Sequence, residues 1–294
     1  MGAKPGKRSS SSLRVRVCGK DGLVAQLLHP DWIARDDAKA VGSNLRAVED
    51  ELTRVNAQAK LVLSGGGLLE VYWDATLSHK SWRSEATLNT LVDQVHASVQ
   101  PILNALASAK RDYVIGVDVF DKNDIGGGQF AVVLNKGTIK AIAWKSYPVL
   151  QESNWLAGFG TLKGRQSPRV LSTALGTTAV LVCHDVQAYN HRNQALVRRA
   201  YQPTDRNKVI TDMESLMRSS KSEWVLSLVH QIDEESDMVT FRKSYKQLNA
   251  DYDHAPTVIG AFGYGPSVQS LLLPLAEKAQ FPDGSSNTVV VLEP

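Results

Sequence analysis

The stretch GQFAVVLNKGTIKAIAWKSYPV, residues 128–149, decides how we expect this chain to fold. Two apolar runs rich in β-branched residues flank Asn-Lys-Gly at 135–137, which is typical of a tight turn between paired antiparallel strands. The run DYVIGVDVF (112–120) before it and the run RVLSTALGTTAVLVC (169–183) after it also have the composition of strands. The sequence therefore predicts a sheet through the middle of the chain.

Helical patterns alternate with these strands. Apolar residues recur at three- and four-residue spacing in segments near 36–60 and 84–109, and helices are also expected near 206–219 and 240–253. Further strands are predicted from the runs EWVLSLVH (223–230), TVIGAFGYG (257–265) and NTVVVLEP (287–294). This mixture of strand–helix alternation and hairpins favours an α/β fold with a mixed sheet, in one domain over residues 13–294. Residues 1–12 are expected to form a disordered basic tail.

Composition and charge exclude several classes of protein. The chain has 294 residues, 43% of them hydrophobic, which is enough for a large core. Its formal charge of +3 falls to about −2 without the five basic residues among the first 16, so we do not expect nucleic-acid binding. Two cysteines provide no disulfide framework, and we find neither a membrane-length apolar run nor a secretory signal. We expect a cytoplasmic protein that does not bind membranes.

Cys183 stands where the apolar run 179–182 ends and polar residues begin. A strand end followed by a sharp turn exposes a side chain and the next backbone N–H groups, which suits a nucleophile. The alternative is an ordinary buried thiol, because free cysteine is among the most buried residue types. On a regular strand His184 would point away from Cys183, so we do not expect a dyad of these two residues. The spacing of His184, Asp185 and His191 matches no standard metal site.

The order of these segments resembles the carbon–nitrogen hydrolase (nitrilase) superfamily over residues 113–265. The hairpin that ends in AWKSYPV, the strand that ends in VLVCHD and the later segment that ends in GAFGYG follow one another as in that family. The resemblance implies a nitrilase-like four-layer α-β-β-α sandwich with two mixed sheets. It also implies a homodimer or larger homo-oligomer that needs no metal ion and no organic cofactor.

The resemblance assigns roles to individual residues. Cys183 matches the family's nucleophile, Lys145 its catalytic lysine, and Glu152 a second acid that many members carry soon after that lysine. The backbone N–H of His184 is then an oxyanion donor. In this chemistry a carboxylate accepts the thiol proton, and a protonated lysine stabilises the anionic tetrahedral intermediate.

The family's general base is a glutamate, usually in a Pro-Glu pair at a strand end. Here the predicted strand KLVLS ends at Ser64 and is followed by Gly65 and Gly66, and none of these three residues is an acid. Glu70 is the nearest candidate. It reaches the site if the glycines form an inserted loop, whereas the base is missing if they replace the motif.

Two functions therefore remain open from the sequence. The first is hydrolysis of a non-peptide carbon–nitrogen bond in a small molecule, an amide or carbamoyl group rather than a nitrile, through a thioester on Cys183. The second is a catalytically decayed nitrilase-like binding or scaffold protein, which the absence of the Pro-Glu pair motivates.

Overall fold

The computed structural model describes most of the chain between residues 16 and 290. The described residues are 16–19, 22–28, 45–53, 55, 59–73, 84–121, 126–149, 152–154, 156–159, 167–198, 205–232, 235–254, 256–264 and 288–290. The expected basic tail, residues 1–12, lies outside them.

The first sheet is mixed and has seven strands. They are β1 (Arg16–Gly19), β2 (Gly22–Leu28), β3 (Leu61–Ser64), β4 (Leu69–Trp73), β5 (Asp112–Asp121), β6 (Gly126–Asn135) and β7 (Thr138–Trp144). The strands β2, β3 and β5 run parallel, and β5, β6 and β7 form an antiparallel meander. The predicted turn between β6 and β7 is confirmed: Lys136 and Gly137 both have positive φ, as a two-residue hairpin turn requires.

The second sheet is also mixed and has five strands in the order β12-β11-β10-β9-β8. They are β8 (Val170–Thr173), β9 (Gly176–Val182), β10 (Trp224–Ile232), β11 (Thr257–Tyr264) and β12 (Thr288–Val290). All neighbours are parallel except β8 and β9, which form a hairpin. Cys183 is the first residue after β9, at the carboxyl end of this largely parallel sheet.

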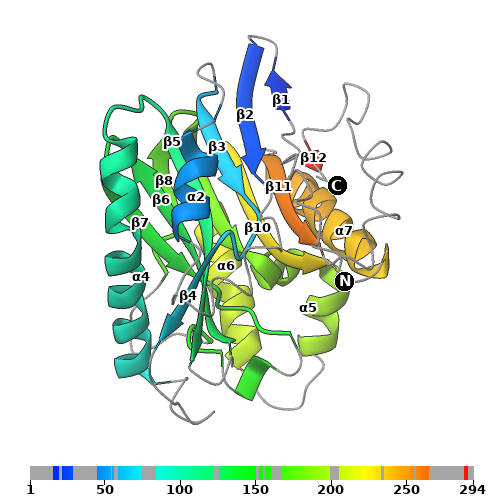
Figure 1. The fold of residues 1–294 in the computed structure, drawn as a ribbon. Helices are drawn as coiled ribbons and strands as arrows, with labels where there is room; N and C mark the ends of the chain where they lie inside the picture. Colours follow the sequence, from blue (N-terminus) through cyan, green and yellow to red (C-terminus); the bar gives the residue numbers. More distant parts are fainter. Residues whose placement is uncertain are drawn as a thin grey trace, which may run out of the picture.

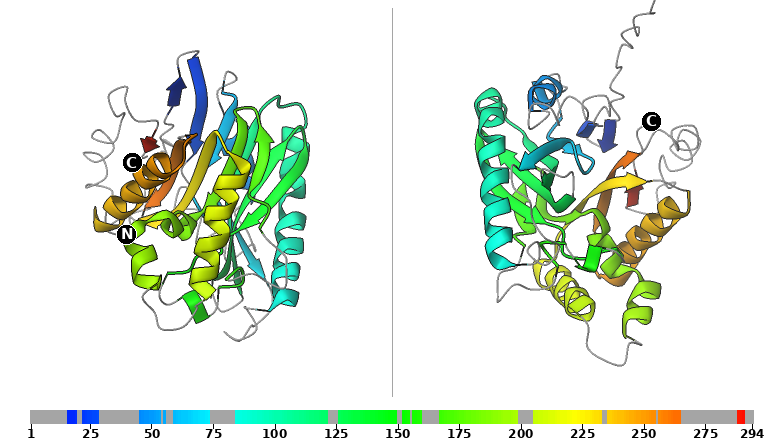
Figure 2. Two further views of the ribbon diagram at one scale, coloured as in Figure 1. Left: turned by 180° about the vertical axis from the view of Figure 1, so that it is seen from behind. Right: turned by 60° about the horizontal axis from the view of Figure 1, so that its bottom comes forward.

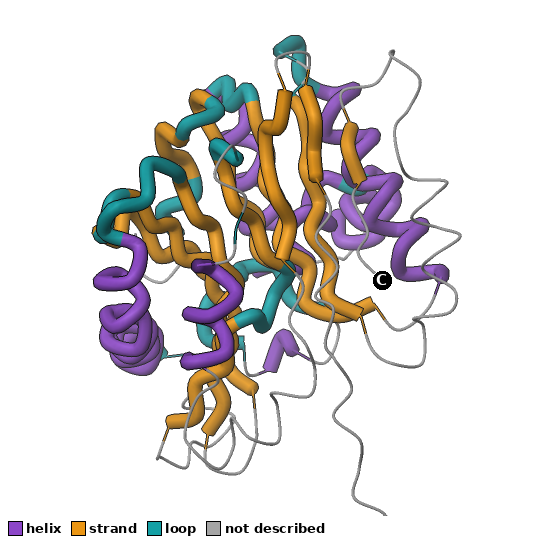
Figure 3. Tube along the Cα trace, turned by 45° about the horizontal axis from the view of Figure 1, so that its top comes forward, coloured by secondary structure: helices purple, strands orange, loops and turns teal. Residues whose placement is uncertain are grey.

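Helices cover the outer face of each sheet (Figures 1 and 2). On the first sheet lie α2 (Leu45–Thr53) and α4 (Glu85–Leu106), and on the second lie α5 (His191–Arg198), α6 (Asp205–Ser220) and α7 (Glu235–Asp251). Figure 3 shows the strands of both sheets between the helices.

Three hydrophobic clusters correspond to the three interfaces between these layers. One lies between α4 and the first sheet, one between the two sheets, and one between the second sheet and α6 and α7. Side chains alternate along β5 accordingly: Val117 faces α4, whereas Val114 packs between the sheets. The predicted fold class, an α-β-β-α sandwich with two mixed sheets, is therefore confirmed.

The strand β4 was not among the predicted elements, and it settles how the glycine segment folds. Leu63 pairs with Val114 and Leu69 pairs with Val117. The chain therefore advances six residues from β3 to β4 while β5 advances three. The Gly65–Leu68 segment is therefore an insertion that interrupts a single line of pairing along β5. None of the described helices has the length and apolar character needed to cross a membrane.

Candidate functional site

Lys145 extends the ladder of β7 by one residue, through a hydrogen bond from its N–H to the Gln129 carbonyl oxygen. Its side chain is only 1% exposed. The ammonium group lies 2.8 Å and 2.7 Å from the two carboxylate oxygens of Glu152, in a short 3-10 turn (η1, Glu152–Asn154). Glu152 also accepts the Val149 N–H at 2.9 Å, which folds the segment between the two charges onto the ion pair. The structure thus brings two of the residues assigned from the sequence into direct contact.

Cys183 follows the last residue of β9 and begins the 3-10 helix η2 (Cys183–Tyr189). Its φ of 51° is in the left-handed region, which non-glycine residues rarely adopt. Because this turn breaks the strand geometry, His184 does not point away from the thiol as expected from regular alternation. The Sγ atom lies 3.1 Å from His184 Nδ1. The expectation that the two side chains point apart was therefore wrong.

A buried ion pair joins the end of β7 to the turn at Cys183. Asp185, fully buried, lies 2.6 Å from the Arg169 guanidinium. Its carboxylate also accepts the N–H groups of Ser146, Tyr147 and Val182 at 2.8 to 3.1 Å. Arg169 in turn donates to the Trp144 carbonyl and to the Ser146 hydroxyl. We call these contacts the Asp185–Arg169 network; it fixes the backbone on both sides of Lys145 relative to Cys183.

These neighbours determine the charges in the site. Burial alone would lower the pKa of Lys145, but the nearby Cys183, Glu152 and Asp185 raise it above its ordinary value. Lys145 is therefore a cation at neutral pH. Burial and the positive charge of Lys145 lower the pKa of His184 to about 4, so its imidazole is neutral. The thiol thus lies beside one neutral ring and one fixed positive charge.

Glu70 lies on β4, buried, on the face of the first sheet that looks toward the second sheet. It alternates with Leu69 and Val71, which pack on the α4 side. Glu70 pairs in register with Asp118 on β5, and Asp118 pairs with Gln129 on β6, beside Lys145. We call these four residues the inner-face row.

Glu70 and Lys145 stand at the two ends of the inner-face row. Three strand spacings separate their backbones, or about 14 Å. The pKa of Lys145 is raised by the nearby Cys183, Glu152 and Asp185. The structure therefore brings Lys145, Glu152, Cys183 and His184 together and leaves Glu70 on the same inner face, farther along it.

Sequence reasoning did not identify Arg169 or Asp118. Asp118 had a usable signal, since an acid within the apolar run DYVIGVDVF is unusual for a buried strand. Arg169 had none, because its partners lie 16 and 25 residues away in the chain.

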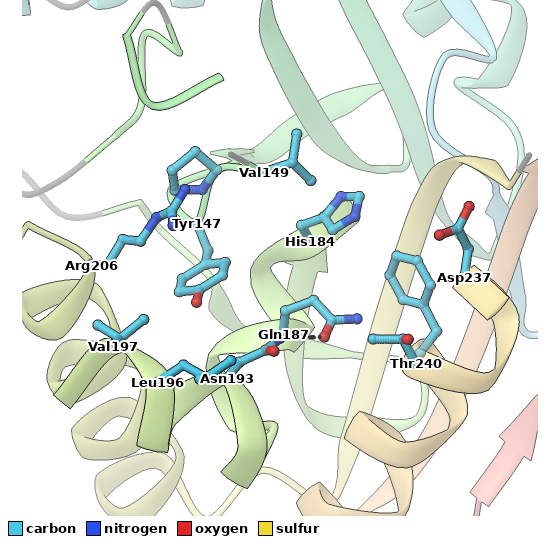
Figure 4. Close-up of a pocket in the computed structure, with 12 residues that line it drawn as sticks. Tyr147, Val149, His184, Gln187, Asn193, Leu196, Val197, Arg206, Asp237 and Thr240 are labelled. Carbon is cyan, nitrogen blue, oxygen red and sulfur yellow. Dashed lines mark hydrogen bonds between the residues drawn. The ribbon is translucent and has the colours of Figure 1, made fainter. Parts of the chain in front are cut away.

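A pocket of about 550 Å³ borders this cluster on the side of the helices. Residues from α5, α6, α7, η2 and the segment 147–149 line it (Figure 4). His184 belongs to its wall, whereas Cys183, Lys145 and Glu152 are not among the described residues that line it. We refer to it as the α5–α7 pocket. Among the described residues, no group of three or more His, Cys, Asp or Glu side chains could hold a metal ion.

Comparison with known proteins gives similarity in structure only. No protein-family model matches the sequence, and no curated protein matches it. Among solved structures, an amidase from Nesterenkonia sp. is similar at 16% identity and a TM-score of 0.48, over 88% of this chain and 81% of that one.

Two other similar structures are a Saccharomyces cerevisiae member of branch 10 of the nitrilase superfamily and a carbon–nitrogen hydrolase from Helicobacter pylori G27. The first has 12% identity and a TM-score of 0.45, over 76% of this chain and 70% of the other. The second has 14% identity and a TM-score of 0.45, over 82% of this chain and 73% of the other. Their descriptions name the nitrilase superfamily and a carbon–nitrogen hydrolase. Identities and TM-scores this low assign no function to this chain, so its function is inferred from the residues of the site.

Proposed function

We propose that this protein hydrolyses a non-peptide carbon–nitrogen bond, in an amide or carbamoyl group, through a thioester on Cys183. One observation carries the proposal. A buried Lys145–Glu152 ion pair lies beside a cysteine that is held in a left-handed conformation at the end of a parallel strand. A fixed cation next to a thiol favours the thiolate, which is the reactive form.

In the proposed reaction a carboxylate accepts the thiol proton while the sulfur attacks the carbonyl carbon. The negative charge that develops on the carbonyl oxygen is stabilised by the Lys145 ammonium group and by the backbone N–H of His184. That N–H belongs to the first turn of η2, where helical N–H groups have no intrahelical acceptor. The carbon–nitrogen bond then breaks, the nitrogen takes the proton and leaves, and water hydrolyses the thioester to release the acid.

We assign the general base to Glu70, with Glu152 in support. Two features favour Glu70: the Gly65–Leu68 segment is an insertion, and Glu70 lies on the inner face of the sheet in the same row as Lys145. Asp118 lies one strand closer to Lys145 along that row and is the competing candidate. Glu152 already binds Lys145, so its contribution is to hold the ammonium group in place.

A catalytically decayed binding protein is the second candidate. It is favoured by the sequence Ser64-Gly65-Gly66, where the nitrilase superfamily has its Pro-Glu pair. The low exposure of the thiol also favours it, since Cys183 is 3% exposed.

The rate of Cys183 alkylation by iodoacetamide from pH 5 to pH 9 separates the two candidates. Cys18 is the internal reference, and each rate is measured in the wild type and in Glu70→Gln, Asp118→Asn, Lys145→Met and the exposed control Glu85→Gln. If the protein is an enzyme, we expect Cys183 to be alkylated fast below pH 7. This fast reaction should be lost in Lys145→Met and in Glu70→Gln and kept in Glu85→Gln. If Asp118→Asn removes it instead, the base is Asp118.

Slow alkylation of Cys183 at every pH in all variants would support the decayed protein. If alkylation is fast, the next step is a screen of small amides for ammonia release, with Cys183→Ala as the inactive control.

A further inference from the structure

The α5–α7 pocket has a wall that is mostly apolar and a charge at either side. Tyr147, Phe241 and Leu196 supply apolar surface, and Leu196 is 60% exposed at the rim. Figure 4 shows Arg206 and Asp237 on opposite sides of the pocket, with His184 between them. A volume of about 550 Å³ is in the range of sites that bind small molecules.

Arg206 is a cation that lines this pocket. It is half-buried on the first turn of α6, and none of the described residues forms an ion pair with it. Its charge acts instead on the Tyr147 hydroxyl, which belongs to the same pocket. A guanidinium group in this position can form charge-assisted hydrogen bonds to a carboxylate.

The opposite charge at the other side of the pocket sets the direction in which a ligand lies. Asp237 repels an anionic group, so the anionic end of a ligand is directed to Arg206. An apolar body attached to that anionic end would cover Tyr147 and Phe241. Its other end would then lie near His184, whose Nδ1 atom is 3.1 Å from the Cys183 sulfur.

We propose that the α5–α7 pocket is the binding site for a small, mostly apolar carboxylate, held by Arg206, with its uncharged end at His184. The claim that the pocket binds a carboxylate depends on the pocket alone. The claim about the substrate rests on the proposed function: if Cys183 is the nucleophile, the substrate is a carboxylate-bearing amide whose scissile group lies at the His184 side of the pocket.

Binding is tested with 4-phenylbutyrate and its neutral analogue 4-phenylbutanol, by calorimetric titration of the wild-type chain. Neither compound contains a carbon–nitrogen bond, so the result does not depend on catalysis. We expect the acid to bind about tenfold or more tightly than the alcohol, because only the carboxylate can form charge-assisted hydrogen bonds with the Arg206 guanidinium. Arg206→Gln should remove that difference, whereas the same substitution at the exposed Arg192 should leave it unchanged.

Three results would overturn the binding site. The first is equal binding of the acid and the alcohol. The second is binding of inorganic phosphate as tight as that of 4-phenylbutyrate, which would indicate a site for charge alone. The third is a change of oligomeric state in sedimentation for Arg206→Gln without a change in ligand affinity, which would make the pocket a contact between subunits.

Alkylation of Cys183 in the presence of saturating 4-phenylbutyrate tests whether a substrate reaches Cys183 from this pocket. Protection of the thiol in the wild type, lost in Arg206→Gln, supports a substrate that reaches the nucleophile from this pocket. Tight binding without any protection keeps the binding site and overturns its link to Cys183. If Cys183 is inert at every pH even without the ligand, the proposed function fails while the binding result stands.

Discussion

The two edges of the candidate site are built in different ways. At the end of β7 and β9, the charges of Lys145 and Arg169 are each paired with a buried acid, and the Asp185–Arg169 network ties both strand ends together. Along β4 and β5, two acids, Glu70 and Asp118, stand opposite one another in neighbouring strands, after a glycine-rich insertion. Cys183 and Lys145, the proposed nucleophile and its cation, are therefore joined by a buried network, whereas Glu70, the proposed base, lies on a strand that follows the glycine-rich insertion.

The Asp185–Arg169 network should give the largest effect in a test of this comparison. We expect Asp185→Asn to lower the free energy of unfolding by about 3–5 kcal/mol, because it leaves the Arg169 charge buried without its partner. Urea unfolding followed by fluorescence measures the loss. The matched control is Asp251→Asn, which breaks the exposed pair with His191 and should cost less than about 1 kcal/mol. Equal losses in the two variants would mean that the β7–β9 edge is not held by this network.

His184 should make stability depend on pH at the same edge. Its pKa is about 4 in the folded protein and about 6.5 when unfolded, so between these values the unfolded chain binds more protons. Stability should therefore fall as the pH falls from 6.5 to 4, by at most about 3 kcal/mol from this residue. Urea unfolding of the wild type and of His184→Gln at pH 7 and pH 4 measures the difference. Parallel losses in both proteins would show that the imidazole is not kept neutral by its surroundings.

The glycine insertion on the other edge gives a smaller effect. A Cβ at Gly116 would contact the Gly65 carbonyl oxygen and lie 2.6 Å from the Gly66 Cα. We therefore expect Gly116→Ala to cost about 1–3 kcal/mol by forcing the inserted loop away from β5. It should also slow Cys183 alkylation, because Glu70 moves with the loop.

The control for Gly116→Ala is Ser64→Ala. It removes the hydrogen bond from the Gly116 N–H to the Ser64 hydroxyl and costs about 1 kcal/mol without adding volume. An unchanged alkylation rate in Gly116→Ala, despite lost stability, would argue against Glu70 as the base.

Much of the fold could be predicted because local patterns specify it. The apolar runs that form β5, β9 and β10 are interior strands with neighbours on both sides, and the turn at Lys136–Gly137 needs only its own residues. The strand β4 was missed because Leu69–Trp73 is short and follows directly on the glycines. The helix α5 was missed because HRNQALVR has too few apolar residues to show a helical period.

The site was less predictable because its geometry depends on contacts between distant segments. Lys145, Glu152 and Cys183 came from a resemblance in motif order, and no local spacing would have joined them. The orientation of His184 depends on the positive φ of Cys183, which the sequence AVLVCHD does not reveal. The partner of Asp185 is an arginine 16 residues earlier, and only the hairpin of β8 and β9 brings the two together.

The separation between the α5–α7 pocket and the Asp185–Arg169 network has a consequence for how such a protein can diversify. Leu196 and Val197 on α5 and Thr240 on α7 line the pocket, and none of them takes part in the described contacts of Asp185 or Arg169. Substitutions at these three positions can reshape the pocket while the strand ends keep their stability. If the pocket binds the proposed carboxylate, its ligand preference can therefore drift by neutral steps over generations, without an intermediate that loses the folded site.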